Sequence, residues 1–563
     1  MNQEIRSKLD RICNILWGGG LAVPTLFVEQ ISYLIYLKLL DEREADLEVK
    51  ARLLKGKSNG KLLFPDQASR YRWSNWRFKS GKELRDFLGG EVFPYMASLL
   101  KEEPQVAIYF QDAKLEIEDP HVLKEVVDGL DTFQFGKLGP DVKGDIFEYL
   151  LQYLSRQPQS DMGQFRTPRQ IRMAMVEMLD PDLGDTMCDL ACGTAGFLVD
   201  SVEHILAKYS AAPREVPIYG EEWLVDRGWT LAQARREIPN LQTYRKGAGE
   251  KIPDWELLEY SIFGFEVSRQ MMRISMMNLV LHGIRNAHVK RANSLSELGG
   301  MSDEDLRRRY KCILMNPPFA GMLPAESIRK DLPTQSKKSE LLFLGLAMES
   351  LAPGGTCAMI VPEGALFGST SGHVELRKQL MEDYELLAVI SLPAGVFKPY
   401  AGVKTGILVF RKPQPVSESA DRGRREREAR DARRNGKVWF YQINNDGYDP
   451  DKITGGGRPE TPEWNDLPEM LRHWKSYKNS GFKKPPGTEA GALLPPGTKE
   501  ASCWWAKIST ISKNDFNLAA GRYKPRVAEK TPEENPLDLI SGTLKIEKGI
   551  ATALETLLKD VEG

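Results

Sequence analysis

Residues 312–319 of the chain read Cys-Ile-Leu-Met-Asn-Pro-Pro-Phe. The apolar run Cys312–Met315 predicts a buried strand, and the four residues that follow predict a loop at its carboxyl end. In open α/β sheets, ligands bind at that edge. Each proline fixes its own φ angle and restricts the residue before it, so the loop should hold its polar groups rigidly. This stretch therefore predicts an α/β fold with a site on the loop Asn316–Phe319.

The loop Asn316–Phe319 suits methylation of an exocyclic or amide nitrogen, whose delocalised lone pair is a poor nucleophile. The side-chain carbonyl of Asn316 and the main-chain carbonyl of Pro317 could accept its two N–H groups. Phe319 could stack on a flat substrate such as a base extruded from its helix. The alternative is a proline-rich turn with a structural asparagine. An Asn-Pro-Pro-aromatic stretch has a chance probability of roughly one in a hundred or less in a chain of this length, which favours the functional interpretation.

Two further strands are predicted to end in acids. Residues 186–190 should form one strand, which carries Asp189 and leads through the small-residue loop Ala191–Leu198 into a helix. Residues 261–266 should form another, which ends at Glu266. Glycines allow a close approach of ligand to backbone, and an acid at the end of the second strand suits ribose hydroxyls. Tight turns or solvated strand ends are the alternatives, but together the motifs indicate an adenosyl cofactor.

Three other segments could complete the site. Thr167 and Pro168 are predicted as the N-cap and first turn of a helix, whose N-terminus would attract a carboxylate. Asn293 follows another predicted strand, where it could bond an adenine or merely close a turn. The segment Leu392–Thr405 interleaves aromatic residues, glycines and lysines, so it could hold a flipped base and its phosphates or be a plain connecting loop.

The composition bounds the class of protein. The chain has 563 residues, of which 41% are hydrophobic and 28% charged, and its formal net charge is −1. A protein that binds DNA alone usually carries a basic excess. Either the basic residues cluster on one face, or another chain supplies much of the DNA contact. The six cysteines form no Cys-x-x-Cys pair, and no signal or membrane-spanning segment is recognised, which indicates a cytoplasmic protein without disulfides.

The chain divides into four predicted parts. Apolar residues at helical spacing dominate the first part, and strands then alternate with helices, which predicts a doubly wound, mostly parallel sheet. Residues 437–441 are expected to add an edge strand, and the tail at about 543–562 an amphipathic helix that packs on its own body or on a partner. The predicted parts are a helical domain (1–140), an α/β domain (141–412, with an insertion at about 213–255), a charged linker (413–436) and a C-terminal region (437–563).

The signature Asn-Pro-Pro-Phe resembles that of S-adenosylmethionine-dependent amino-methyltransferases, whose adenine-N6 and glutamine-amide members share it. The order of motifs is more specific. The block Gly163–Ile171, then Asp189–Leu198, Glu266, Asn316–Phe319 and Leu392–Thr405 closely resembles the methylation subunit of type I restriction-modification systems.

That resemblance implies a Rossmann-like methyltransferase fold: a doubly wound, mostly parallel seven-stranded sheet with a helical N-terminal domain and a C-terminal helical tail. It implies methyl transfer from S-adenosylmethionine to adenine N6 in duplex DNA, without a metal. A separate specificity subunit would read the DNA, and a restriction subunit often accompanies it. The C-terminal helix is then the best candidate for docking the specificity subunit.

The resemblance also assigns residue roles. Where the family often has Asp, this chain has Asn293 at the adenine edge, and Ala195 replaces a frequent glycine. The implied catalytic residues are Asn316, Pro317 and Phe319, which hold the target adenine; the implied cofactor-binding residues are Asp189, Gly193, Gly196, Glu266 for the ribose, Asn293, and Thr167 and Pro168 near the methionine end.

Three rival functions stay open at this point. A glutamine-amide methyltransferase of translation factors would share the central loop but lack the block Gly163–Ile171. A self-contained adenine methyltransferase would need its own recognition domain. A non-catalytic scaffold would keep the cofactor pocket without transferring a methyl group.

Overall fold

A computed structural model describes most of the chain. The described residues are 3–21, 23–53, 63–135, 138, 140–151, 167–209, 215–217, 243–245, 254–319, 321–398, 402–415, 422–453, 458–528 and 536–562. Residues 163–166 and nearly all of the predicted insertion at 213–255 lie outside them. Of the insertion, the structure describes two short antiparallel strands, β2 (Glu215–Pro217) and β3 (Thr243–Arg245).

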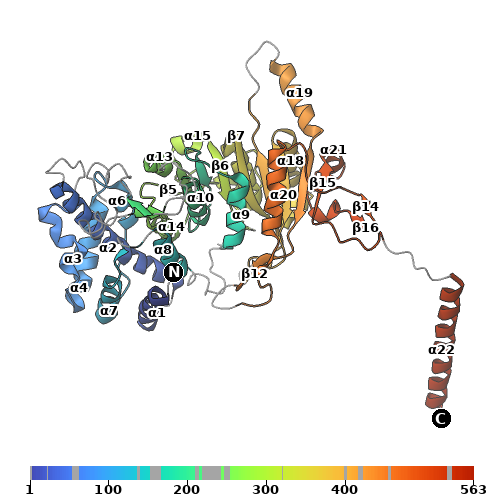
Figure 1. Cartoon of the computed structure of the whole chain (residues 1–563), viewed down its shortest axis with the longest axis horizontal. Helices are drawn as coiled ribbons and strands as arrows, with labels where there is room; N and C mark the ends of the chain where they lie inside the picture. The colour runs from blue at the N-terminus through green and yellow to red at the C-terminus, as the bar shows by residue number, and fades with distance from the viewer. Residues whose placement is uncertain are drawn as a thin grey trace.

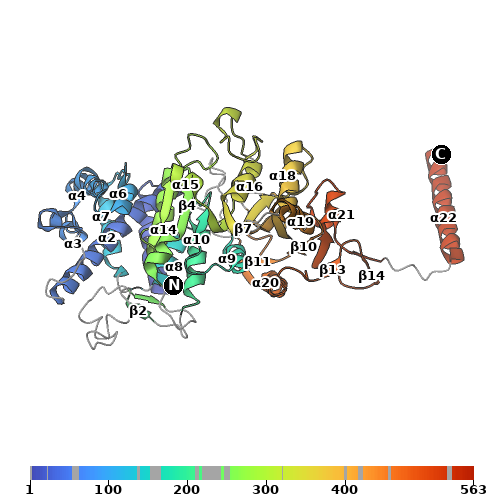
Figure 2. The same ribbon diagram turned by 90° about the horizontal axis from the view of Figure 1, so that it is seen from above.

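The first part of the chain is helical, as predicted. Most described side chains of helix α2 (Pro24–Leu53) are buried. Between Phe27 and Leu40 the apolar residues are not confined to one face of the helix, so the helix is covered all round. The other helices surround it (Figures 1 and 2). They are α1 (Gln3–Gly18), η1 (Asp66–Tyr71), α3 (Trp73–Trp76), α4 (Gly81–Phe87), η2 (Leu88–Val92), α5 (Phe93–Ser98), α6 (Pro104–Phe110), α7 (Pro120–Asp131) and α8 (Pro140–Leu151).

A ten-stranded sheet forms the centre of the rest, in the order β13-β15-β10-β8-β9-β7-β6-β1-β4-β5. Strand β9 runs antiparallel to β7 and β8, and β15 antiparallel to β10, while the other pairs are parallel. The strands are β1 (Met187–Asp189), β4 (Ile262–Glu266), β5 (His288–Arg291), β6 (Tyr310–Met315), β7 (Leu351–Pro362), β8 (Glu385–Ser391), β9 (Thr405–Arg411), β10 (Lys437–Gln442), β13 (Thr488–Glu489) and β15 (Cys503–Lys507).

This sheet confirms the predicted fold class and corrects two details. The seven strands from β5 to β8 in that order are extended by β10, β15 and β13, so the sheet is longer than predicted. The prediction of an edge strand at residues 437–441 was wrong, because β10 lies between β8 and β15. The predicted C-terminal region thus continues the central sheet, and the domain boundaries themselves stay a prediction.

Helices cover both faces of the sheet. Side chains alternate along β6: Cys312 and Leu314 join the core on one face, and Ile313 and Met315 the core on the other. The first face carries α9 (Arg169–Leu179), α10 (Gly196–Leu206), α14 (Arg269–Leu281) and α20 (Leu467–Asn479); the second carries α16 (Ser339–Ser350), α18 (Ser371–Glu382) and α21 (Ile508–Ser512). Shorter elements are α13 (Trp255–Tyr260), α15 (Asp303–Arg307), η5 (Ala325–Ser327), α17 (Glu363–Phe367), β14 (Leu493–Leu494), η6 (Ala520–Arg522) and β16 (Arg526–Val527).

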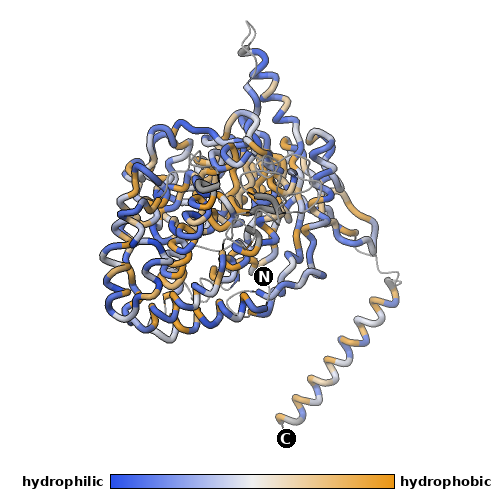
Figure 3. Tube along the Cα trace, turned by 60° about the vertical axis from the view of Figure 1, so that its left-hand side comes forward, coloured by the Kyte–Doolittle hydropathy of each residue, from blue (hydrophilic) through white to orange (hydrophobic). Residues whose placement is uncertain are grey.

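Two helices stand away from these layers. The charged segment forms α19 (Arg422–Arg434), an exposed helix whose Arg430 and Arg434 pair with Asp383 and Glu382 near the end of α18. Helix α22 (Pro536–Glu562) stands apart from the body in both views (Figures 1 and 2) and alternates apolar and polar residues along its length (Figure 3). No helix in the described ranges is both long and apolar enough to cross a membrane.

Candidate active site

The site lies where the strand order reverses. Within the sheet, β4 and β5 lie to one side of β1, and the next strands along the chain, β6 and β7, lie to its other side. Because β1 is parallel to both β4 and β6, the three carboxyl ends meet at one edge. This edge brings together Asp189, Glu266 and the loop that starts at Asn316. Such a switch point is the usual ligand site of a doubly wound sheet.

Two buried acids form one side of the site. Glu266 accepts the main-chain N–H of Gly193 on Oε2 (3.0 Å) and that of Ser268 on Oε1 (2.8 Å). Asp189 accepts the main-chain N–H of Ala191 (3.0 Å). Burial, reinforced by the charge of Glu266, raises the pKa of Asp189 to about 8, although the Ala191 N–H opposes the shift. A ligand with hydroxyl donors or positive charge would relieve this crowding of acids.

The loop between β1 and α10 is shaped by its backbone. Gly193 and Ala195 have φ angles of +52° and +61°, in the left-handed region. That conformation suits Gly193 and strains Ala195. The side-chain amide of Asn278 donates to the carbonyl of Thr194 (2.8 Å), and the N–H of Cys192 donates to the carbonyl of Phe265 (2.9 Å). Helix α14 and strand β4 therefore hold the loop in place.

Close packing against Arg172 requires a glycine at position 196. A Cβ atom there would lie 2.9 Å from Nε of Arg172. Arg172 pairs with Asp200 of α10 (Nε to Oδ2, 2.7 Å) and donates to the carbonyl of Thr167 (2.9 Å), with both charged side chains almost fully buried. Sequence reasoning missed this pair; the signal was a charged residue on each of two otherwise apolar helix faces. Arg172 thus connects α10 to the segment that precedes α9.

Asn316 is held by Thr167. Its amide nitrogen Nδ2 donates to Oγ1 of Thr167 (3.0 Å), so the carbonyl oxygen Oδ1 takes the opposite direction. The prediction of Thr167 as the N-cap was wrong: α9 begins at Arg169, its N-cap is Pro168, and no side chain caps it. The hydroxyl of Thr167 serves Asn316 instead. The structure therefore places the predicted cofactor residue Thr167 in contact with a predicted catalytic residue.

Phe319 meets the segment 392–405. Its ring lies edge-on to Phe397, with 5.6 Å between centroids and 73° between planes. Phe397 is buried, whereas Phe319 is partly buried. The carbonyl of Pro318 accepts the hydroxyl of Ser339 at the start of α16 (3.3 Å). The predicted stacking residue is thus backed by an aromatic residue from the segment that sequence analysis placed beside it.

Asn293 closes a turn. Its Oδ1 accepts the N–H of Leu295 (3.2 Å), its N–H donates to the carbonyl of Gly299 (2.8 Å) and its carbonyl accepts the N–H of Ser296 (3.1 Å). A Cβ atom on Gly299 would lie 1.9 Å from the Asn293 carbonyl oxygen, so only glycine fits there. The structure shows the turn, and the adenine contact stays a prediction.

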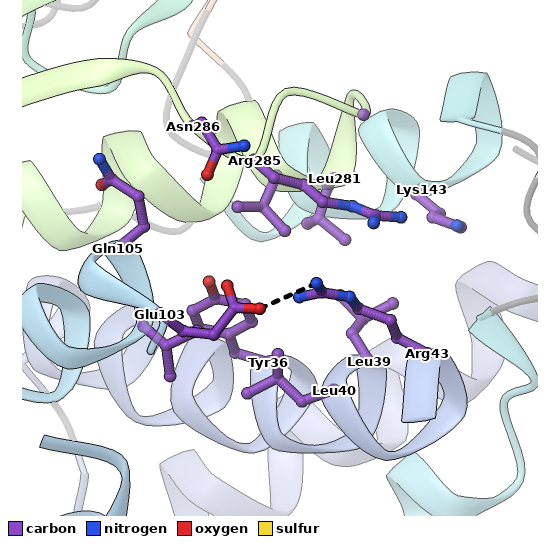
Figure 4. Close-up of a pocket in the computed structure, with 13 residues that line it drawn as sticks. Tyr36, Leu39, Leu40, Arg43, Glu103, Gln105, Lys143, Leu281, Arg285 and Asn286 are labelled. Atoms are coloured by element: carbon purple, nitrogen blue, oxygen red, sulfur yellow. Dashed lines mark hydrogen bonds and ion pairs between the residues drawn. The ribbon is translucent and has the colours of Figure 1, made fainter. Parts of the chain in front are cut away.

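A separate pocket lies between the helical part and the α/β part (Figure 4). Residues of α2, α6, α8 and the end of α14 line it, and Arg43 pairs with Glu103 across it (2.9 Å). Burial, followed by the neighbouring charge of Arg285, lowers the pKa of Lys143 to about 8. The lining contains no residue of the strand-end site, so this pocket belongs to the contact between the two parts.

Known proteins resemble the chain over most of its length. The family described as N-6 DNA Methylase matches residues 139–243 and 248–532, and the HsdM N-terminal domain matches residues 5–130. The methylase subunit of the type I restriction enzyme EcoEI of Escherichia coli is 29% identical over 520 residues, which are 90% of this chain and 87% of that protein. The EcoKI methylase subunit of Escherichia coli K12 is 25% identical over 451 residues, 78% and 72% of the two chains.

Solved structures agree on the fold. The type I restriction-modification methyltransferase subunit of Streptococcus thermophilus aligns with a TM-score of 0.60 at 17% identity, over 93% of this chain and 99% of that one. A chain from a study of type I system assembly and conformational transition aligns with a TM-score of 0.64 at 24% identity, over 100% and 99%.

Proposed function

We infer the roles of the site residues from one premise: the chain belongs to the N-6 DNA methylase family, as the methylase subunit of a type I restriction-modification system. It is an adenine-specific DNA methyltransferase that modifies adenine N6. Family membership implies S-adenosylmethionine as methyl donor. One observation carries the residue assignment: the loop Asn316–Phe319 leaves β6 at the same sheet edge as Asp189 and Glu266.

The target adenine would be held by the loop. Oδ1 of Asn316 and the carbonyl of Pro317 would accept the two N–H groups of N6, which draws electron density onto the nitrogen and frees its lone pair. Thr167 fixes the Asn316 amide, so the acceptor is oriented before substrate arrives. Phe319 would stack on the extruded base, and Phe397 supports its ring from the edge.

The buried acids suit the methyl donor. Glu266 already uses both oxygens for main-chain N–H groups, and each oxygen can accept a second donor such as a ribose hydroxyl. Asp189 and the half-buried backbone of Gly193 would lie against the rest of the ligand. When bound, S-adenosylmethionine supplies a methyl group on a positively charged sulfur, and this nearby positive charge would lower the raised pKa of Asp189.

Transfer would be a direct displacement. S-adenosylmethionine, held by Asp189, Glu266 and the loop at Gly193, would supply the methyl group, and N6, held by Asn316 and Pro317, would accept it. N6 then loses one proton to solvent. The chain contributes alignment and exclusion of water, which together account for much of the acceleration of such reactions. No side chain needs to act as a strong base, because the proton becomes acidic only once the bond to carbon has formed.

Sequence choice would belong to another subunit. The net charge of −1 gives the chain no overall attraction to phosphates, so we assign much of the DNA contact to a specificity subunit. Helix α22 is the candidate docking element: Ile546, Ile550, Leu554 and Leu557 lie on one face, and each is about half to two-thirds exposed. A restriction subunit would join the same assembly.

The test is transfer of labelled methyl from S-adenosylmethionine to duplex DNA, with this chain alone and with a specificity subunit. We expect label in adenine only when both are present. Label with the chain alone would identify a self-sufficient methyltransferase instead. Label in protein glutamine would support the amide-methylating alternative. Cofactor binding without any transfer would identify a scaffold and overturn the proposal.

A further inference from the structure

We propose that the cluster of Asp446, Arg458 and Tyr448, which lies outside the proposed substrate and cofactor contacts, positions the target base by setting Phe397 against Phe319. Its residues belong to β11 (Asp446–Tyr448) and to the segment leading into β12 (Glu460–Asn465), an antiparallel pair beyond the central sheet. The inference rests on the proposed function, because it assumes that Phe319 stacks on the adenine.

The ion pair between Arg458 and Asp446 is bidentate and buried. Nη1 of Arg458 donates to Oδ1 of Asp446 (2.9 Å), Nη2 donates to Oδ2, and the side chains are 4% and 2% exposed. Nη2 also donates to the main-chain carbonyl of Val396 (3.0 Å). The planar guanidinium therefore fixes the position of Val396 relative to β11 in both distance and direction.

Val396 directly precedes Phe397. A second tie follows at once, since Nζ of Lys398 donates to the carbonyl of Pro450 (3.1 Å). Phe397 is thus flanked on both sides by residues anchored to the segment around β11, and its buried ring meets Phe319 at 5.6 Å. A shift of the Val396 carbonyl would move the Phe397 ring, and Phe319, which packs against that ring, would move with it.

The same cluster reaches the cofactor side. Burial raises the pKa of Tyr448, and the nearby main-chain N–H of Gln170, in the first turn of α9, opposes this shift. The Arg458 guanidinium lies 5.3 Å from the centre of the Tyr448 ring. Gln170 is three residues after Thr167, which orients Asn316. The cluster therefore bonds the support of Phe319 and lies beside the helix turn that follows the support of Asn316.

A positioning role explains why the pair is ionic. Buried ion pairs are weak sources of net stability, and apolar side chains of similar size often replace them without loss. Geometry is what such a replacement would lose, because an apolar pair cannot bond the Val396 carbonyl. The cost of an apolar replacement of the pair should therefore fall on the chemical step rather than on folding.

The experiment uses the complex with its specificity subunit and two duplexes. An unmodified duplex reports turnover, and a duplex with 2-aminopurine at the target adenine reports base extrusion by its fluorescence, because 2-aminopurine has no N6 amino group to methylate. In Arg458→Lys, one ammonium cannot serve both Asp446 oxygens and Val396, so we expect kcat to fall about tenfold and the fluorescence of the extruded base to change. KM for DNA and Kd for S-adenosylmethionine should stay within about twofold. Tyr448→Phe should lower kcat by about threefold at most, because it removes only the hydroxyl and keeps the ring beside Arg458.

A matched control comes from the contact between α14 and α2. Arg273 pairs with Glu29, both side chains are 5% exposed, and Arg273 also donates to the carbonyl of Gln111. Arg273→Lys should lower the melting temperature as Arg458→Lys does, but leave kcat and the fluorescence unchanged. The double variant Asp446→Leu with Arg458→Met should fold and still lose turnover.

Three results would overturn the inference. One is wild-type turnover in Arg458→Lys together with unchanged fluorescence. Another is an equal fall of kcat in Arg273→Lys, which would mean general loosening. A wild-type complex that transfers no methyl group to adenine would instead refute the proposed function, and this inference with it.

Discussion

At the residue scale, Asn316 combines the properties that methylation of a weak nitrogen nucleophile requires. It is placed by a buried strand, restrained by the prolines after it and oriented by Thr167. We expect Asn316→Ala to lower methyl transfer at least about 100-fold, as loss of a preorganised transition-state contact does. Binding of S-adenosylmethionine, measured by calorimetry, should be largely retained. An equal loss of binding and transfer would reject this role.

Thr167 offers a milder test of the same contact. Thr167→Val keeps the shape of the side chain and removes the oxygen that accepts from Asn316 Nδ2. A neutral hydrogen bond contributes about 1 kcal/mol, so we expect kcat to fall about fivefold. KM for DNA should change little, because the base surface is untouched. If only cofactor affinity changes, Thr167 serves the methionine end rather than Asn316.

Asp189 gives the site a pH signature. Its pKa is raised to about 8, whereas the unfolded value is near 4, so the folded state holds a proton that the unfolded chain has released across this range. This group therefore lowers the stability of the protein as pH rises from about 4 to 8, by at most about 1.4 kcal/mol per pH unit. The neutral Asp189→Asn should lose this term, so its melting temperature relative to the wild type should be higher at pH 8 than at pH 5. A constant difference across that range would contradict the shift.

At the element scale, α22 is a helix whose apolar face has no cover in the described structure. Replacing Ile550 and Leu554 with Ser should leave the melting temperature of the isolated chain within about 1 °C, because exposed substitutions rarely matter for stability. The same variant should fail to co-purify with a specificity subunit. As a control, Lys548→Ser and Glu555→Ser on the polar face should assemble normally. Normal assembly of the apolar variant would exclude α22 as the docking element.

Elements predicted from local patterns were recovered, and those that depend on distant partners were not. Residues 312–319 predicted β6 and its loop correctly, because the apolar run, its length and the two prolines all lie within eight residues. Strand β15 pairs with β10 across 62 to 70 positions of chain (503 − 441 and 507 − 437), and no local pattern encodes that pairing. The cap at Thr167 failed for a related reason, since Asn316 competes for its hydroxyl from 149 residues away. The acids at the strand ends and the loop Asn316–Phe319 were thus predictable from sequence. The pairs Arg172–Asp200 and Arg458–Asp446, which bond the carbonyls of Thr167 and Val396, were not.

At the scale of the whole molecule, the helical part and the α/β part share one core. A single cluster of buried apolar residues runs from Leu9 in α1 through α14 to Trp474 in α20. The buried pair Arg273–Glu29 adds a polar tie between α14 and α2. A boundary near residue 140 therefore separates two kinds of secondary structure without separating two hydrophobic cores.

This shared core predicts how the protein unfolds. Because exposing α2 would also expose the apolar face of α14, neither part can melt while the other keeps its packing. We expect calorimetry to show one main transition, with α22 contributing little because its side chains are already exposed. Glu29→Ala strands the charge of Arg273 in the interior, which typically costs about 3–5 kcal/mol, so it should lower the transition temperature without splitting the peak. Two separated transitions in the wild type would show that the helical part folds on its own, and that the cluster is a contact between domains rather than a common core.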